Sequence, residues 1–150
     1  MNTAAEVERW MKDARGSLAS AERAFQVGDF RIATQQAQLC TELSAKAVIA
    51  HFAEPAWRHD PGKQLLALVD ECQRTQRLDE QPRQNLVRLA DDADEVAPWH
   101  GWSTYGREQD GVQVAAVDLC THDVASDLLT RARRSLQAAI LFAEQVVKPK

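Results

Sequence analysis

Residues 28–49 read GDFRIATQQAQLCTELSAKAVI, and this stretch decides the fold. Apolar residues recur along it at helical spacing and form two separate stripes. A helix that is apolar on two sides has neighbours on two sides, so this segment is predicted to be the central helix of a bundle. One stripe contains Phe30, Ala33, Ala37, Cys40 and Ala47, and the other contains Ile32, Leu39, Leu43 and Ala50.

The segments before and after the central helix have the same helical periodicity. One apolar stripe runs through residues 7–25, and a longer one runs through residues 124–147. Between the first stripe and the central helix stand only Gly28 and Asp29, a junction that fits an antiparallel helical hairpin. Asp29 is also a suitable cap for the central helix.

Two shorter apolar stripes, within residues 65–72 and 86–93, predict a third and a fourth helix. Residues 97–121 break the pattern with Pro and Gly, and we expect an irregular segment there, without strands, that either covers the end of the bundle or binds a ligand. The prediction is an all-α protein, an antiparallel up-and-down bundle of four to five helices, with residues 1–150 forming a single domain.

Composition narrows the class of protein. A chain of 150 residues can bury a core without disulfides or metal, and its net charge of −4 argues against a broad basic surface for nucleic acid. No apolar run approaches membrane-spanning length, and the N-terminus does not resemble a signal peptide. The three scattered cysteines fit a reducing compartment, so we expect a cytoplasmic protein with no membrane contact.

The sequence offers little support for metal or catalytic chemistry. No Glu is followed by His three residues later, and the four histidines are isolated from one another along the chain. We therefore predict no metal site, no cofactor and no catalytic residue. The acidic residues within 91–95 are interpreted as a solvated helix end.

Polar residues within apolar segments are the better candidates for a binding site. Glu42 and Lys46 lie four positions apart on the central helix, either as a surface pair, which we favour, or facing an interior groove or dimer seam. Residues 58–60 (Arg-His-Asp) and 105–107 (Tyr-Gly-Arg) offer groups suited to phosphate or base contact, or to holding their loops in place.

The chain resembles HEPN domains, the higher eukaryotes and prokaryotes nucleotide-binding family. Residues 28–49 are similar to the family's second helix, with an acidic turn, an aromatic residue, Gln-rich turns and a Glu before Lys-Ala. His59 and Asp60, with the leucines that follow, resemble its His-Asp-Leu segment. Tyr105 and Arg107 resemble its loop before the last helix, and residues 123–147 resemble that helix.

The resemblance implies a helical homodimer that binds a nucleotide or RNA, or a minimal nucleotidyltransferase partner in a toxin–antitoxin or defence module. The expected ligand-binding residues are Glu42, Lys46, His59, Asp60, Tyr105 and Arg107. Many members are metal-independent ribonucleases with an Arg, four to six residues and then a His. That motif is absent here, so we expect a protein that is not an enzyme. The alternatives are a diverged ribonuclease toxin using Arg107 with His100 or His122, and a dimeric scaffold without ligand.

Overall fold

The computed structural model describes residues 3–75 and 78–147, and this part of the chain is almost entirely helical. The long helices are α1 (Thr3–Gln26), α2 (Phe30–Ile49), α4 (Glu80–Val96) and α7 (His122–Val147), with the shorter α3 (Gly62–Arg74) between α2 and α4. The all-α bundle is therefore confirmed. None of the described helices is long and apolar enough to cross a membrane.

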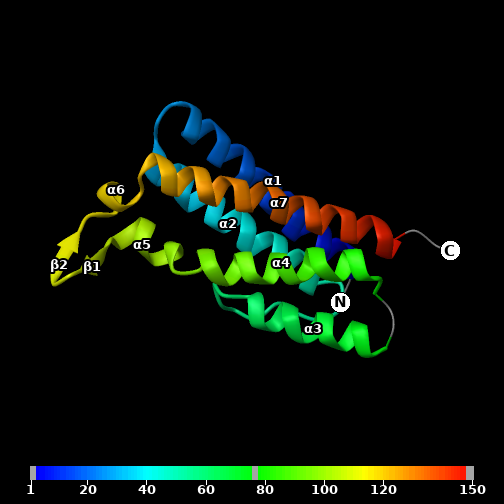
Figure 1. Cartoon of the computed structure of the whole chain (residues 1–150). Coiled ribbons are helices and arrows are strands. Elements are labelled where there is room, and N and C mark those ends of the chain that lie inside the picture. Colours follow the sequence, from blue (N-terminus) through cyan, green and yellow to red (C-terminus); the bar gives the residue numbers. More distant parts are fainter. Residues whose placement is uncertain (1–2, 76–77, 148–150) are drawn as a thin grey trace.

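Helix α2 lies at the centre of the bundle, as its two apolar stripes predicted. It packs against α1, α7 and α4 and also contacts α3 and α5 (Figure 1). Every residue of α2 from Cys40 to Ile49 is buried. Asp29 caps its first turn by accepting a hydrogen bond from the Ile32 amide at 3.2 Å, and Gly28 makes the preceding turn with a φ of 79°.

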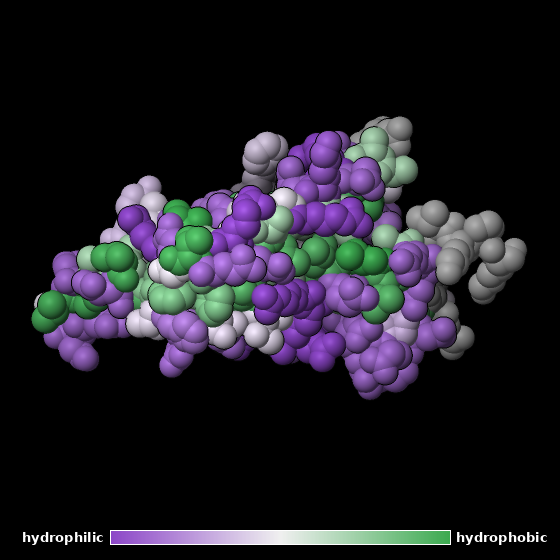
Figure 2. All heavy atoms as spheres, turned by 90° about the horizontal axis from the view of Figure 1, so that it is seen from above, coloured by the Kyte–Doolittle hydropathy of each residue, from purple (hydrophilic) through white to green (hydrophobic). Residues whose placement is uncertain are grey.

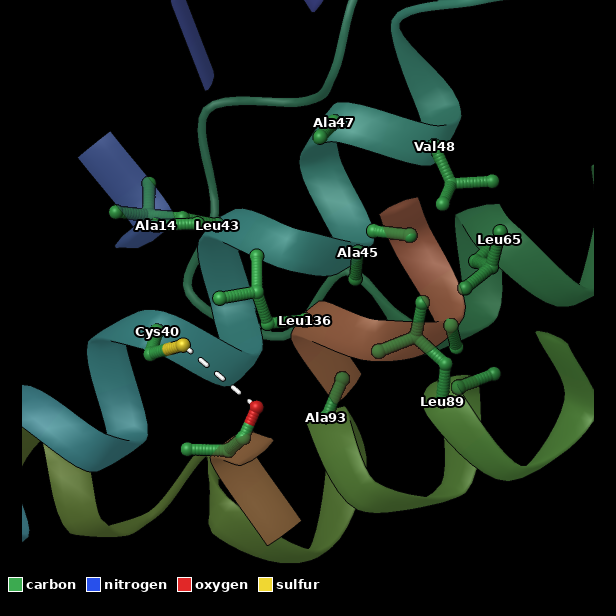
Figure 3. Packing of buried hydrophobic residues seen from close by; sticks show 14 of the residues in the cluster. Ala14, Cys40, Leu43, Ala45, Ala47, Val48, Leu65, Leu89, Ala93 and Leu136 are labelled. Carbon is green, nitrogen blue, oxygen red and sulfur yellow. Dashed lines mark hydrogen bonds between the residues drawn. The ribbon is translucent and has the colours of Figure 1, made fainter. Parts of the chain in front are cut away.

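The core forms where α2 meets α7 and α4. Leu43 of α2 lies beside Leu136 of α7, and Leu89 and Ala93 approach from α4 (Figure 3). The Cys40 thiol donates a hydrogen bond of 3.7 Å to the Ala132 carbonyl oxygen across the α2–α7 contact. Small side chains at these positions let the helices approach closely, which explains the many alanines of α2.

Residues 97–121 are more ordered than predicted, and the expectation of an irregular segment without strands is wrong. Helix α5 (Trp99–Tyr105) is followed by strands β1 (Arg107–Gln109) and β2 (Val112–Val114) and by the single-turn α6 (Ala116–Leu119). The strands pair antiparallel, and the hairpin extends from one end of the bundle (Figure 1). Each of these elements is too short to show a clear hydrophobic period in the sequence. Glycines stand in the turns between them.

The prediction of a solvated acidic helix end is also wrong for one residue. Asp92 of α4 is only 2% exposed and accepts hydrogen bonds from Arg131 Nη1 at 3.0 Å and from Arg134 Nε at 2.7 Å. Asp91, Asp94 and Glu95 remain exposed. Of these four acidic residues, only Asp92 lies on the side of α4 that faces α7, where two arginines compensate the burial of its charge.

Candidate functional site

Glu42 is the centre of a polar cluster inside the bundle. Its side chain is 4% exposed, and it accepts hydrogen bonds from Gln38 Nε2 at 3.1 Å and from Lys46 Nζ at 3.2 Å. Residues four apart share one face of a helix, so α2 itself aligns the three side chains. The preference for a surface pair is wrong, since both Glu42 and Lys46 are buried.

His59 joins this cluster from the loop between α2 and α3. Its Nδ1 lies 3.3 Å from both carboxylate oxygens of Glu42, while 60% of its side chain remains exposed. A buried carboxylate needs several donors to replace water, and His59 adds a third to those from Gln38 and Lys46.

His100 completes the cluster from α5. Its ring stacks on the ring of His59, with centroids 3.6 Å apart and planes inclined by 16°. Its Nδ1 lies 3.3 Å from Gln38 Oε1. The two histidines are far apart along the chain, and the fold brings them together.

The chemistry of Glu42 assigns the protons of its neighbours. An ionised carboxylate only accepts hydrogen bonds, so Gln38 must turn its NH2 group toward Glu42 and its oxygen toward His100. The Gln38 oxygen can only accept, so His100 carries its proton on Nδ1 and leaves Nε2 with a free lone pair. Burial lowers the pKa of His100, as do His59 and Lys46, whereas Glu42 acts in the opposite direction.

The same cluster holds groups able to bind a metal. One ligand atom each from Glu42, His59 and His100 lies within 4.8 Å of the other two. The sequence showed no metal-binding spacing because the three ligands come from α2, a loop and α5.

A hollow of about 350 Å³ opens on another side of Lys46, between α1 and the loop that follows α2. Lys46 Nζ lies 5.6 Å from the ring centroid of Trp10, and Arg9 Cζ lies 4.4 Å from it. Trp57 is 95% exposed at the hollow, and Trp10 Nε1 is buried with no hydrogen-bond partner among the described residues. The hollow is lined by Glu6, Arg9, Trp10, Lys46, Ala50, Ala53, Glu54, Pro55, Ala56 and Trp57.

The other predicted site residues lie elsewhere. Asp60 is paired with Arg58, whose hydrogen bonds lower the pKa of this carboxyl. Tyr105 is exposed at the end of α5, and Arg107 begins β1 with its guanidinium 4.0 Å from the ring centroid of Trp102. The structure thus groups Glu42, Lys46 and His59, and it places Tyr105 and Arg107 at the hairpin end.

Several residues of the site were missed in the sequence. Gln38 precedes Glu42 by four positions, just as Lys46 follows it, and this repeat of polar residues in an apolar helix is a usable signal. Trp10 and Trp57 carry no comparable signal, because nothing local links them to α2, and His100 was named only for the ribonuclease alternative.

Comparison with known families decides the assignment. The model of the HEPN domain matches residues 7–99, which is more than half of the chain. The chain belongs to the HEPN domain family. The matched part of this HEPN domain runs from α1 to the first residue of α5 and includes Gln38, Glu42 and His59, whereas His100 lies just beyond it. None of the curated proteins and none of the solved structures compared with the chain matches it.

Proposed function

We propose that this HEPN domain is a non-catalytic binding protein that holds a nucleotide in the hollow beside Lys46. The observation that carries the proposal is the place of Lys46, whose ammonium lies between the buried Glu42 carboxylate and the ring of Trp10. Membership of the family supports a role related to nucleotides or RNA.

The lining of the hollow suits a nucleobase next to a small charge. The exposed face of Trp57 is available for base stacking, a contact worth about 1–3 kcal/mol per base. Arg9 and Lys46 supply positive charge, but Glu6 and Glu54 line the same hollow. This balance, with the net charge of −4, favours a small nucleotide over a long RNA backbone.

Trp10 lines the hollow and has one buried polar atom without a partner in the described part of the chain. Its buried Nε1 donor has no acceptor among the described residues, and an unpaired buried donor costs about 1–3 kcal/mol. A ligand oxygen that reached this N–H would remove the cost. Glu42 acts indirectly in this proposal, because it holds the Lys46 ammonium in place.

Calorimetric titration and thermal unfolding with AMP, GMP, CMP and UMP test the proposal. A nucleotide present at 100 times its dissociation constant stabilises the folded chain by about 2.7 kcal/mol. Trp57→Ala should abolish the shift, whereas Trp102→Ala, a tryptophan that does not line the hollow, should leave it intact. The proposal is wrong if no nucleotide binds, or if binding survives Trp57→Ala.

Incubation with labelled RNA tests the ribonuclease alternative. Arg107 lies over Trp102, while His122 packs 5.2 Å from Phe25 and 5.3 Å from Phe30 between ring centroids. We expect the RNA to stay intact. If the wild type cleaves RNA and both Arg107→Ala and His122→Ala do not, the protein is a ribonuclease and the proposal of a non-catalytic protein is wrong.

The hairpin end favours a protein partner as a second role. Several hydrophobic side chains lie among hydrophilic ones at that end of the molecule (Figure 2), where Tyr105, Val112 and Val117 are exposed. These exposed side chains make this end a candidate interaction surface. We propose that it receives a partner of the minimal nucleotidyltransferase type in a toxin–antitoxin or defence module. Val112→Asp should abolish co-purification with a co-expressed nucleotidyltransferase while leaving nucleotide binding unchanged.

Dimerisation through the long helices is part of the same proposal. An apolar groove between α1 and α7 includes Val7, Met11 and Ile140 and is the expected seam between two copies. Light scattering should give twice the chain mass, and Ile140→Glu, at a half-buried residue of the groove, should reduce it to that of one chain. If the chain stays monomeric at high concentration, the dimer proposal is wrong, and the nucleotide site then belongs to the single chain.

A further inference from the structure

We propose that Glu42, His59 and His100 form a binding site for a divalent transition-metal ion of the zinc type. One carboxylate oxygen and one ring nitrogen from each histidine lie within 4.8 Å of one another. Two imidazoles with a carboxylate are a donor set that zinc and its neighbours accept, and they leave a fourth tetrahedral position for water. This site is distinct from the tryptophan-lined hollow, and the inference does not depend on nucleotide binding.

The three ligand atoms are already close, but the ring of His59, the most exposed of the three, must leave its stacked position before it can share an ion. Zinc bonds of about 2.1 Å in a tetrahedron place neighbouring ligand atoms about 3.4 Å apart. Glu42 is fixed by α2 and His100 by its hydrogen bond to Gln38. His59 stands on a loop with 60% of its side chain exposed, so its ring can tilt out of the stack to share an ion with His100.

Gln38 provides the outer support that metal-binding histidines need. It is 1% exposed, donates to Glu42 at 3.1 Å and accepts from His100 Nδ1 at 3.3 Å. This hydrogen bond leaves the Nε2 lone pair of His100 for a metal. A carbonyl or carboxylate oxygen on the other ring nitrogen is the usual device that orients a histidine ligand.

Lys46 distinguishes a cation site from an anion site. Its ammonium lies 3.2 Å from Glu42 Oε2 and competes with any cation for that carboxylate. Lys46→Met should therefore bind a metal more tightly than the wild type. The same change should lower the affinity for a nucleotide, because it removes positive charge from the hollow. The two proposals predict opposite effects of one substitution, so the failure of either is recognisable by itself.

Titration of tag-free, chelator-treated full-length protein with Co²⁺ and Zn²⁺, without nucleotide, tests the site. Co²⁺ reports ligation by its visible absorption, and calorimetry gives the Zn²⁺ affinity and stoichiometry. We expect one ion per chain, and affinity lowered about tenfold or more by His59→Gln, by His100→Gln and by Gln38→Leu. His59→Gln is the variant least expected to disturb the fold, because it changes an exposed loop residue.

His51→Gln and His122→Gln are the matched controls, since each removes a histidine outside the cluster. Both should bind Co²⁺ as the wild type does, and circular dichroism should show the same helical content in all variants. The inference is overturned if the wild type binds no stoichiometric ion, or if binding persists in both His59→Gln and His100→Gln.

Discussion

His59 and His100 stack face to face, 3.6 Å apart, although one belongs to a loop and the other to α5. Each ring is also tied to α2, His59 through Glu42 and His100 through Gln38. The pair therefore connects the α2–α3 loop and α5 to the central helix. It makes this part of the HEPN domain a polar site beside the apolar core.

Removing the charge of Glu42 should strongly destabilise the fold. Glu42→Gln leaves the buried Lys46 ammonium without its counter-ion, and breaking a buried pair in this way costs about 3–5 kcal/mol. Glu42→Gln combined with Lys46→Met should recover most of the loss. Urea denaturation of the two variants and the wild type measures the effect. Equal stability of Glu42→Gln and the wild type would mean that the cluster contributes nothing to folding.

Asp92 should be far more important for stability than its neighbour in the chain. Asp92→Asn weakens the contacts to Arg131 and Arg134, and we expect the free energy of unfolding to fall by about 2–3 kcal/mol, since both arginines keep some access to water. The control Asp91→Asn changes an exposed carboxylate and should stay within about 0.5 kcal/mol. Similar losses for both variants would contradict the structure.

Gly106 should tolerate no side chain, whereas Gly111 should tolerate one at moderate cost. Both have positive φ, 76° and 79°, so Ala is strained at each, and Gly106 also has a ψ of −167°, a combination that essentially only glycine adopts. Only at Gly106 would the added Cβ also collide with the Val114 carbonyl oxygen, while the space at Gly111 is open. We expect Gly106→Ala to unfold at clearly lower temperature than Gly111→Ala. If the two melt together, β2 does not pack against Gly106 as described.

His51 should make the fold less stable in mild acid. Its ring packs edge-on against Phe142 at 5.1 Å, and burial lowers its pKa below the ordinary 6.5. The unfolded chain then takes up the proton first as the pH falls. The stability contributed by the neutral ring is full above about pH 6.5 and is lost as the pH drops toward the folded pKa.

His51→Phe keeps the aromatic packing and removes this titration. Comparing urea denaturation of the variant and the wild type at about pH 7.5 and about pH 5.5 isolates the effect. The wild type should lose stability relative to the variant at the lower pH. A difference that stays constant between the two pH values would show that His51 does not titrate differently in the folded and unfolded chains.

Much of the fold was predictable from short-range pattern. The two stripes of residues 28–49 predicted the central helix, and Asp29 was correctly expected to cap it. The prediction for residues 97–121 was wrong because α5, the two strands and α6 are each too short for periodicity to appear. Asp92 was misread because nothing local shows that two arginines of α7 face it.

The sequence by itself determined the bundle, the central helix and the alignment of Gln38, Glu42 and Lys46, because a helix repeats every 3.6 residues and its apolar faces must be buried. Only the tertiary structure decided that this polar face lies inside the protein, with His59 and His100 stacked beside it and Trp10 and Trp57 around Lys46. Those contacts join distant segments, and their energies depend on packing and burial, which no local spacing encodes.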